Sequence, residues 1–275
     1  MKKQWAFLPI GAAALFLAAC GSSDSTDNSE NTDSGSSTEG ETDLLAEIQE
    51  EGTLVIGTEG TYPPFTFHDD SGELTGFDVE IAREVADRLG VEAEFLETQW
   101  DAMFAGLDAE RFDMVANQVG INEERQESYD FSDPYITSTA VLVVAEDNEE
   151  IQSFDDLEGK LSAQSLTSNY AETATSFGAE LEGVEGFNQA IELLVSGRVD
   201  ATVNDNLTVL DFQNQRPDAG IKIVDKSDDA AQSALLFRKG NETFVEAANE
   251  ALAEMIQDGT YEEISNKWFG ENVLE

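Results

Sequence analysis

Two segments of the chain repeat one another at a fixed spacing. Residues 100–117 read WDAMFAGLDAERFDMVAN, and residues 187–204, 87 positions further along, read FNQAIELLVSGRVDATVN. Each segment predicts an aromatic residue in a loop, then an amphipathic helix, a turn, and a strand with a polar end. The repeat predicts two lobes of similar build that send one strand end each to a shared cleft; a chance match between generic helix–strand patterns is the alternative. The identical pairs are Leu107/Leu194, Arg111/Arg198, Asp113/Asp200 and Asn117/Asn204, and we expect the shared arginines and aspartates to brace the turns.

The polar ends of the two repeated strands are candidate ligand-binding positions. The apolar run 114–116 predicts a buried strand, and Asn117, Gln118 and Gly120 follow it. Ligands of open α/β sheets bind outside the carboxyl ends of strands, so we expect these three residues to line a cleft. The second strand ends in Asp205, whose carboxylate could bind the ammonium group of a ligand.

Arg125 lies five residues after Gly120 and is a candidate carboxylate clamp. The chain has 14 Lys+Arg against 58 Asp+Glu, so a cation beside the predicted cleft is unusual. A guanidinium group can hold a planar carboxylate by two parallel N–H bonds. The alternative is an exposed ion pair with Glu123, Glu124 or Glu127, since such pairs are commonplace.

The formal net charge of −44 restricts the partners of the chain. Such an acidic surface repels nucleic acid and anionic lipid headgroups, so we expect neither as a partner. The excess of acid over lysine also suits a protein that works in high salt, where self-repulsion is screened. A very soluble extracellular protein is the alternative interpretation.

The high-salt hypothesis predicts that NaCl stabilises the protein, because screening relieves the repulsion between acidic groups. Chemical unfolding at low and at molar NaCl measures this effect. Equal unfolding free energies at the two concentrations would reject the hypothesis.

Cysteine and histidine are too scarce for a disulfide or a common metal centre. Cys20 is the only cysteine, which excludes an intrachain disulfide and a cysteine-based metal site. His68 is the only histidine and lies in a polar His-Asp-Asp stretch, where we expect an exposed residue rather than a metal ligand. We therefore predict neither a metal nor a cofactor.

The first 42 residues read as a targeting segment and a tether. A positively charged start precedes an apolar run over 6–19, which has signal-peptide length and is too short to span a membrane. The sequence LAAC at 17–20 resembles the lipobox of bacterial lipoproteins, which implies cleavage before Cys20 and lipidation of its sulfur. Residues 21–42 hold only Ser, Thr, Asp, Glu, Asn and Gly, which cannot bury a core. We expect 1–19 to be a signal peptide and 20–42 a flexible acidic linker.

The folded part is predicted to start near Asp43 with a short helix that carries Leu44, Leu45 and Ile48 on one face and ends at Gly52. A strand–helix–strand unit follows. Residues 54–57 predict a buried strand, 77–89 an amphipathic helix ended by Gly90, and 91–95 a second strand. Such a unit implies that its two strands pair in parallel. Further strands are predicted over 141–144, 161–163, 221–224 and 233–237, and a late helix over 244–256.

Two loops that follow predicted strands carry further candidates. Two prolines stiffen the first loop and hold Tyr62 and Phe65 just past a strand. These aromatics either wall a ligand pocket or belong to the rim of the core. The second loop contains Thr167, Ser168 and Asn169 and precedes a helix from about 171. Its free N–H groups could bind an anion, or Ser and Thr only cap the helix.

Ordered motifs from about Gly52 to Val273 resemble the family 3 solute-binding proteins of amino-acid ABC transporters. These motifs are GTYPPF at 60–65, GFDV at 76–79, EER at 123–125, DFSDPY at 130–135, DGTY at 258–261 and KWFG at 267–270. Within the family, the chain is most similar to the L-cystine-binding lipoproteins of Gram-positive bacteria. That narrower match is carried by ETQW at 97–100, NQVG at 117–120, AQSLTSNY at 163–170 and VEG at 184–186.

The resemblance implies an α/β fold of two lobes, of the periplasmic-binding-protein type II, with the ligand cleft between the lobes. Two hinge strands, near 136–140 and 231–236, would join them. Lobe 1 would be discontinuous, over 43–135 and 236–275, and lobe 2 would cover 136–235. The lobes of this family close on their ligand.

The resemblance also implies how the two charged groups of an amino acid are bound. Arg125 would bind the α-carboxylate, together with the backbone at Gly120 and at Thr167–Ser168. Asp205 and Gln118 would bind the α-ammonium group.

Tyr62 and Trp100 would sandwich the aliphatic part of the ligand. At three other positions the chain departs from many relatives. Those relatives have Ser where this chain has Gly120, and Ser or Ala where it has Gln118. This chain therefore lacks a hydroxyl group there, and its contacts to the ammonium group differ. The same relatives have Asp where this chain has Glu59. The longer Glu59 side chain could reach a second ammonium group.

The implied function is capture of L-cystine outside the cell and delivery to the permease, and through it the ATPase, of an ABC transporter. Cystine has two amino-acid heads, and the second could be bound by Glu59, Asn117, Ser165, Asn169 and Asn204. We expect a monomer, held at the extracellular face of the cell membrane by a lipid on Cys20.

Three alternative functions stay open. The protein could bind another polar amino acid, such as glutamine, arginine or histidine. It could be a dehydratase-like enzyme on the same fold. It could also be a sensor domain that reports to a receptor.

Overall fold

The computed structural model describes residues 43–274. The predicted signal peptide, the lipidation site Cys20 and the linker lie outside the described residues. The described chain is a mixed α/β structure whose largest sheet has the strand order β11-β8-β12-β6-β1-β5.

The first lobe opens with the predicted strand–helix–strand unit, which the structure confirms. β1 (Thr53–Thr58) pairs in parallel with β5 (Glu92–Glu97), and α2 (Phe77–Leu89) connects them. Only glycine fits before α2, because Gly76 has φ 131° and a Cβ there would collide with the backbone of Phe65. The same connection holds a small antiparallel sheet of β2 (Thr61–Tyr62), β3 (Thr66–His68) and β4 (Leu74–Thr75).

The two repeated segments fold alike and belong to two matching sets of elements. The order β1-α2-β5-α3-β6 is followed later in the chain by β9-α5-β10-α6-β11. β1 pairs in parallel with β5 and β6, and β9 pairs in parallel with β10 and bridges in parallel to Ala201 before β11. The bounds are α3 (Trp100–Asp108), β6 (Met114–Gly120), β9 (Leu161–Gln164), α5 (Asn169–Ser176), β10 (Glu180–Gly183), α6 (Phe187–Val195) and β11 (Thr202–Asp205).

The shared aspartates explain one of the identities between the repeats. The Asp113 backbone N–H donates to Val55 O at 2.8 Å, and its carboxylate accepts the Val55 N–H at 3.0 Å. Asp200 makes the same two hydrogen bonds to Leu161, both at 2.8 Å. Each aspartate therefore ties the turn before its strand to the first strand of its set, which confirms the predicted bracing role for the aspartates. Arg111 and Arg198 are exposed, and within residues 43–274 neither side chain makes a hydrogen bond or ion pair that would brace the turn.

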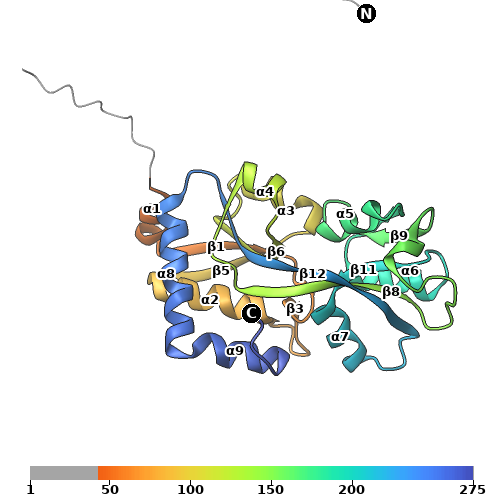
Figure 1. The fold of residues 1–275 in the computed structure, drawn as a ribbon. Helices are drawn as coiled ribbons and strands as arrows, with labels where there is room; N and C mark the ends of the chain where they lie inside the picture. The colour runs from red at the N-terminus through yellow and green to blue at the C-terminus, as the bar shows by residue number, and fades with distance from the viewer. Residues whose placement is uncertain (1–42, 275) are drawn as a thin grey trace, which may run out of the picture. The chain divides into compact units, whose positions relative to one another are not determined.

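Two long strands connect the lobes, as predicted. β8 (Ile136–Ala145) and β12 (Ile221–Arg238) pair antiparallel over 136–139 and 230–233, and Figure 1 shows them side by side. The register of β12 shifts between Lys226 and Ala230, and residues 228–232 are exposed. Because little packing restrains this stretch, it can absorb movement of one lobe relative to the other.

Each lobe has its own hydrophobic core. The largest cluster packs α1, α2, α8 and α9 around β1, and a second one lies beside α3. A third cluster packs α6 and α7 together, and a fourth packs η1 and α5 together. Separate cores allow the lobes to move as units, although the boundaries after Tyr135 and Leu235 stay a prediction. The remaining elements are α1 (Leu44–Glu51), α4 (Glu123–Ser128), β7 (Tyr129–Phe131), η1 (Phe154–Leu157), α7 (Asn206–Gln215), α8 (Glu242–Asp258) and α9 (Thr260–Phe269).

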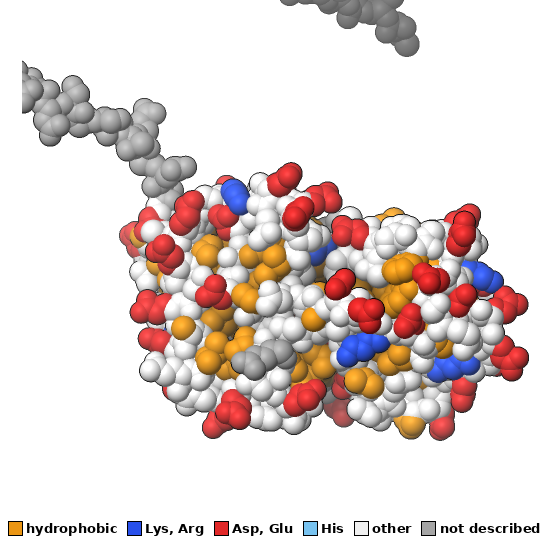
Figure 2. Space-filling view, in the orientation of Figure 1, with side chains coloured by type: hydrophobic (Ala, Val, Ile, Leu, Met, Phe, Trp, Pro, Cys, Tyr) orange, Lys and Arg blue, Asp and Glu red, His pale blue; other side chains and the backbone are white. Residues whose placement is uncertain are grey.

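The surface is strongly acidic. Figure 2 shows Asp and Glu side chains over both lobes, with few Lys or Arg between them. His68 is exposed, as predicted, and its hydrogen bond to Glu97 raises the pKa of His68. No helix within residues 43–274 has the length and hydropathy of a membrane span.

The bracing aspartates predict a loss of stability that leaves the cleft intact. Asp113→Ala leaves the Val55 N–H without its side-chain acceptor, so the unfolding free energy should fall by about 1–3 kcal/mol. Arg111→Ala is the matched control. Arg111 is also identical between the two repeats, but its side chain is exposed, so its removal should change stability by less than about 0.5 kcal/mol. Urea unfolding of the two variants measures this, and equal losses would contradict the bracing role.

Candidate functional site

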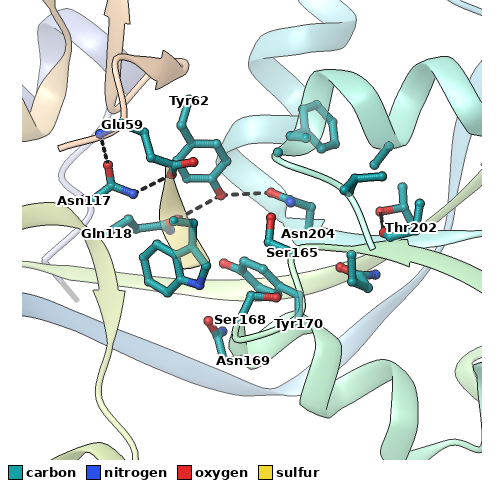
Figure 3. Close-up of a pocket in the computed structure, with 17 residues that line it drawn as sticks. Glu59, Tyr62, Asn117, Gln118, Ser165, Ser168, Asn169, Tyr170, Thr202 and Asn204 are labelled. Carbon is teal, nitrogen blue, oxygen red and sulfur yellow. Dashed lines mark hydrogen bonds between the residues drawn. The ribbon is translucent and has the colours of Figure 1, made fainter. Parts of the chain in front are cut away.

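A cavity between the two lobes collects the predicted strand ends. It encloses about 500 Å³, counting space that opens to solvent, and residues from both lobes line it. In Figure 3, Glu59, Asn117 and Gln118 of the first lobe lie opposite Ser165, Thr202 and Asn204 of the second. The predicted binding residues among its lining are Glu59, Tyr62, Trp100, Asn117, Gln118, Ser168 and Asn169. The other predicted residues, which are not part of the lining, are Phe65, Gly120, Arg125, Thr167 and Asp205.

Tyr62 crosses the cavity, and Phe65 supports it from behind. The Tyr62 hydroxyl lies 3.1 Å from Gln118 Oε1 and 2.8 Å from Asn204 Oδ1, so its one proton is donated to either lobe (Figure 3). Phe65 is fully buried in the largest core cluster, with its ring stacked 5.4 Å from that of Tyr62. Phe65 therefore takes the alternative position in the core and does not wall the cavity.

Arg125 is a buried cation whose partners are carbonyl groups. Its side chain donates from Nη1 to Gly120 O at 2.8 Å and from Nη2 to Thr167 O at 3.0 Å. Within residues 43–274, no carboxylate lies within 4.0 Å of its guanidinium nitrogens. Arg125 is 7% exposed, and this burial lowers its pKa. The alternative of an exposed ion pair with neighbouring glutamates is therefore wrong.

Thr167 connects the loop before α5 to the first lobe. Its N–H and hydroxyl donate to Asp101 Oδ1 at 3.1 and 2.8 Å, while its carbonyl accepts from Arg125. Gly120 faces the same loop, since a Cβ there would lie 3.5 Å from Asn169, which is an ordinary contact. Ser168 caps α5 by accepting the Ala171 N–H at 3.1 Å, so the predicted capping role is confirmed.

Asp205 lies behind the cavity with both carboxylate oxygens engaged. Oδ1 accepts the Leu207 N–H at 2.9 Å and caps α7, while Oδ2 accepts from Ser138 Oγ and from the Tyr170 hydroxyl. Complete burial raises its pKa. Its role as an ammonium partner stays a prediction, and Gln118, 3.4 Å from Ser138 Oγ, links it to the cavity.

Glu59 lies at the end of β1 and is held by Asn117. Asn117 Nδ2 donates to Glu59 Oε2 at 2.7 Å, and Asn117 Oδ1 accepts the Glu59 N–H at 2.8 Å (Figure 3). Burial raises the pKa of Glu59 to about 7. A cationic group beside Glu59 would favour its ionised form.

Asp78 is a buried carboxylate that the sequence interpretation missed. It accepts the Gln118 N–H at 2.6 Å and the Tyr135 hydroxyl at 2.9 Å, and is fully buried. Gln118 has φ 47°, a left-handed conformation that is uncommon for a residue with a side chain. Asp78 therefore holds the strained backbone of a cavity residue. Its sequence signals are its place in the GFDV motif at 76–79 and its position between two apolar residues at the start of a helix, and neither indicates what the carboxylate contacts.

The comparisons with known proteins agree with this architecture. The family model of bacterial extracellular solute-binding proteins, family 3, matches residues 54–271. The chain belongs to this family, and it is a solute-binding protein rather than an enzyme. The L-cystine-binding protein TcyA of Bacillus subtilis is 48% identical over 274 residues, 99% of each chain.

Two solved structures resemble the described residues to different degrees. An ancestral arginine-binding protein bound to arginine has 40% identity and a TM-score of 0.75, covering 79% of this chain and 98% of its own. The L-cystine solute receptor of Neisseria gonorrhoeae, unliganded and open, has 48% identity but a TM-score of 0.56, covering 84% of this chain and 99% of its own. The chain is more similar to the arginine-bound structure despite the lower identity. Across the cleft, Thr167 of the second lobe contacts Arg125 and Asp101 of the first.

Asp78 predicts that stability falls as the pH rises. Burial raises its pKa from 3.8 to about 7, so between about pH 4 and 7 the folded state keeps a proton that the unfolded state releases. Stability is highest below this window and falls by up to about 4 kcal/mol across it. Asp78→Asn should remove this part of the pH dependence, whereas Asp87→Asn, exposed on the same helix, should not. Urea unfolding between about pH 4.5 and 8 tests this, and parallel curves for wild type and Asp78→Asn would contradict it.

Proposed function

We propose that the protein captures L-cystine outside the cell and delivers it to the permease of an ABC transporter. Its relatives in Bacillus subtilis and Neisseria gonorrhoeae are both named for L-cystine, which supports this choice among amino acids. The observation that carries the proposal is Arg125, a buried cation at the closed interface without a carboxylate partner.

One head of the ligand is bound by the groups around Arg125. The guanidinium group neutralises the α-carboxylate through N–H groups that it does not donate to Gly120 O and Thr167 O. Binding by the backbone at Gly120 and Thr167–Ser168 as well requires the Thr167 and Ser168 N–H groups to leave Asp101 Oδ1 and Ser165 O. The α-ammonium group faces Gln118 and Asp205. Tyr62 and Trp100 contact the aliphatic part, consistent with their place in the cavity lining.

The second head extends toward Glu59. Its ammonium group pairs with the Glu59 carboxylate, and its remaining polar atoms meet amide and hydroxyl groups of both lobes. The groups we assign to this end are Asn117, Ser165, Asn169 and Asn204. Three of them, Ser165, Asn169 and Asn204, come from the second lobe, so a ligand with two polar heads engages both lobes along its length.

Arginine is a second candidate ligand, favoured by Glu59. A side-chain guanidinium group placed beside that carboxylate would satisfy it as well as an ammonium group would. The arginine-bound ancestral protein shows that a similar fold accommodates this ligand. Calorimetry with cystine, arginine, glutamine and histidine separates these candidates. Heat from another amino acid and none from cystine would reject the narrow assignment.

We also propose that the protein is lipidated at Cys20 and works as a monomer at the extracellular face of the cell membrane. The flexible linker over 20–42 would let the binding domain reach the permease and the ATPase behind it. Mass spectrometry of membrane fractions, compared with Cys20→Ser, tests this, and equal release of both proteins into the medium would reject it.

Removing the clamp should weaken binding strongly. Arg125→Ala should cost about 2–5 kcal/mol of binding free energy, because the ligand carboxylate loses its buried charge partner. Arg216→Ala is the matched control, since Arg216 also lies on an aromatic ring, that of Phe212, but is exposed outside the cavity. Calorimetry of both variants with L-cystine measures this, and unchanged affinity in Arg125→Ala would place the site elsewhere.

A further inference from the structure

The indole N–H of Trp100 is a buried donor without an acceptor. Trp100 is the first residue of α3, is 7% exposed and lines the cavity. Its Nε1 is one of three buried side-chain atoms without a hydrogen-bond partner in the described part of the chain, beside Trp268 Nε1 and Thr208 Oγ1. A donor removed from water without a partner destabilises a folded protein, so such a group in a native structure requires an explanation.

The surroundings of Trp100 indicate what is missing. The Arg125 Cζ atom lies 5.4 Å from the centre of the indole ring, and Phe104 packs edge-on against the same ring at 5.5 Å. Two groups that can only donate hydrogen bonds, an indole and a guanidinium, therefore share one end of the site. Neither has an anionic partner in residues 43–274.

Trp268 provides the internal comparison. Its indole N–H is equally without an acceptor, but the ring packs edge-on against Phe67 at 5.7 Å and lies outside the cavity lining. Trp268 therefore lies away from the proposed ligand and serves as a control, although exposed Lys267 lies over its ring at 5.1 Å. Only Trp100 combines an unpaired donor with a place in the lining and a neighbouring buried cation.

We propose that the Trp100 indole N–H is a ligand-binding group that donates to the carboxylate neutralised by Arg125. Trp100 would then do more than contact the aliphatic part of the ligand. A ligand without a carboxylate at this position would lose the hydrogen bond and bind more weakly. This inference rests on the proposed function only in requiring an amino-acid ligand. Every amino acid that could bind carries an α-carboxylate, so the identity of the ligand can be wrong while this assignment stands.

The direct test follows the indole protons of the full chain by ¹⁵N–¹H NMR. The signals of Trp100 and Trp268 are assigned with Trp100→Phe and Trp268→Phe, and calorimetry first identifies an amino acid that binds. Addition of that ligand should move the Trp100 indole proton downfield, as a new hydrogen bond to a carboxylate does, while the Trp268 signal stays in place. A Trp100 signal that does not move on saturation would overturn the assignment. The titration itself uses wild type, and either variant alone is enough to tell the two indole signals of the binding domain apart.

The energetic test compares ligands with one and two heads. Trp100→Phe keeps an aromatic ring and removes the N–H, and should weaken both L-cystine and S-methyl-L-cysteine by about tenfold. Trp268→Phe should change neither affinity by more than about twofold. A loss confined to L-cystine would overturn the assignment, because the donor would then serve the second head. Absence of binding by every amino acid, wild type included, would reject the proposed function and this inference together.

Discussion

A buried positive charge with no anion beside it is the feature on which the rest of the site depends. Two backbone carbonyls hold the Arg125 guanidinium group in place but do not neutralise it. Removing an ion from water costs several kcal/mol unless a counter-charge offsets it. In the proposed function the ligand carboxylate supplies this counter-charge, and closure and binding would then stabilise one another. Within residues 43–274, no carboxylate lies within 4.0 Å of the Arg125 guanidinium nitrogens, which leaves this cation available for the proposed ligand.

A second buried network runs across the hinge and carries the opposite charge. It leads from Asp78 in the first lobe through Gln118 to Ser138 on β8, and from there to Asp205 in the second lobe. Burial raises the pKa of both carboxylates. An ammonium group bound beside Gln118 would stabilise the ionised forms. In the proposed function, the two ends of an amino acid would meet complementary networks, a cation at one end and buried acids at the other.

The fold could be predicted from the sequence where local pattern and family motif agree. The parallel β1–α2–β5 unit, the matched helix–strand repeats and the hinge strands follow from periodicity, spacing and ordered motifs. The cavity residues at strand ends, such as Asn117 and Gln118, follow from the geometry of parallel strands. Phe65 could not be placed, because an aromatic past a strand end fits a pocket wall and a core equally well. Asp78 was missed because its partners lie 40 and 57 residues away, and no local pattern reports such contacts.

A crystal structure of the protein with L-cystine tests the central claim most directly. We predict a closed form with one carboxylate of the ligand within hydrogen-bonding distance of the Arg125 guanidinium group, and with its second head toward Glu59. Ligand density that lies away from Arg125, or that turns an ammonium group toward it, would contradict the account.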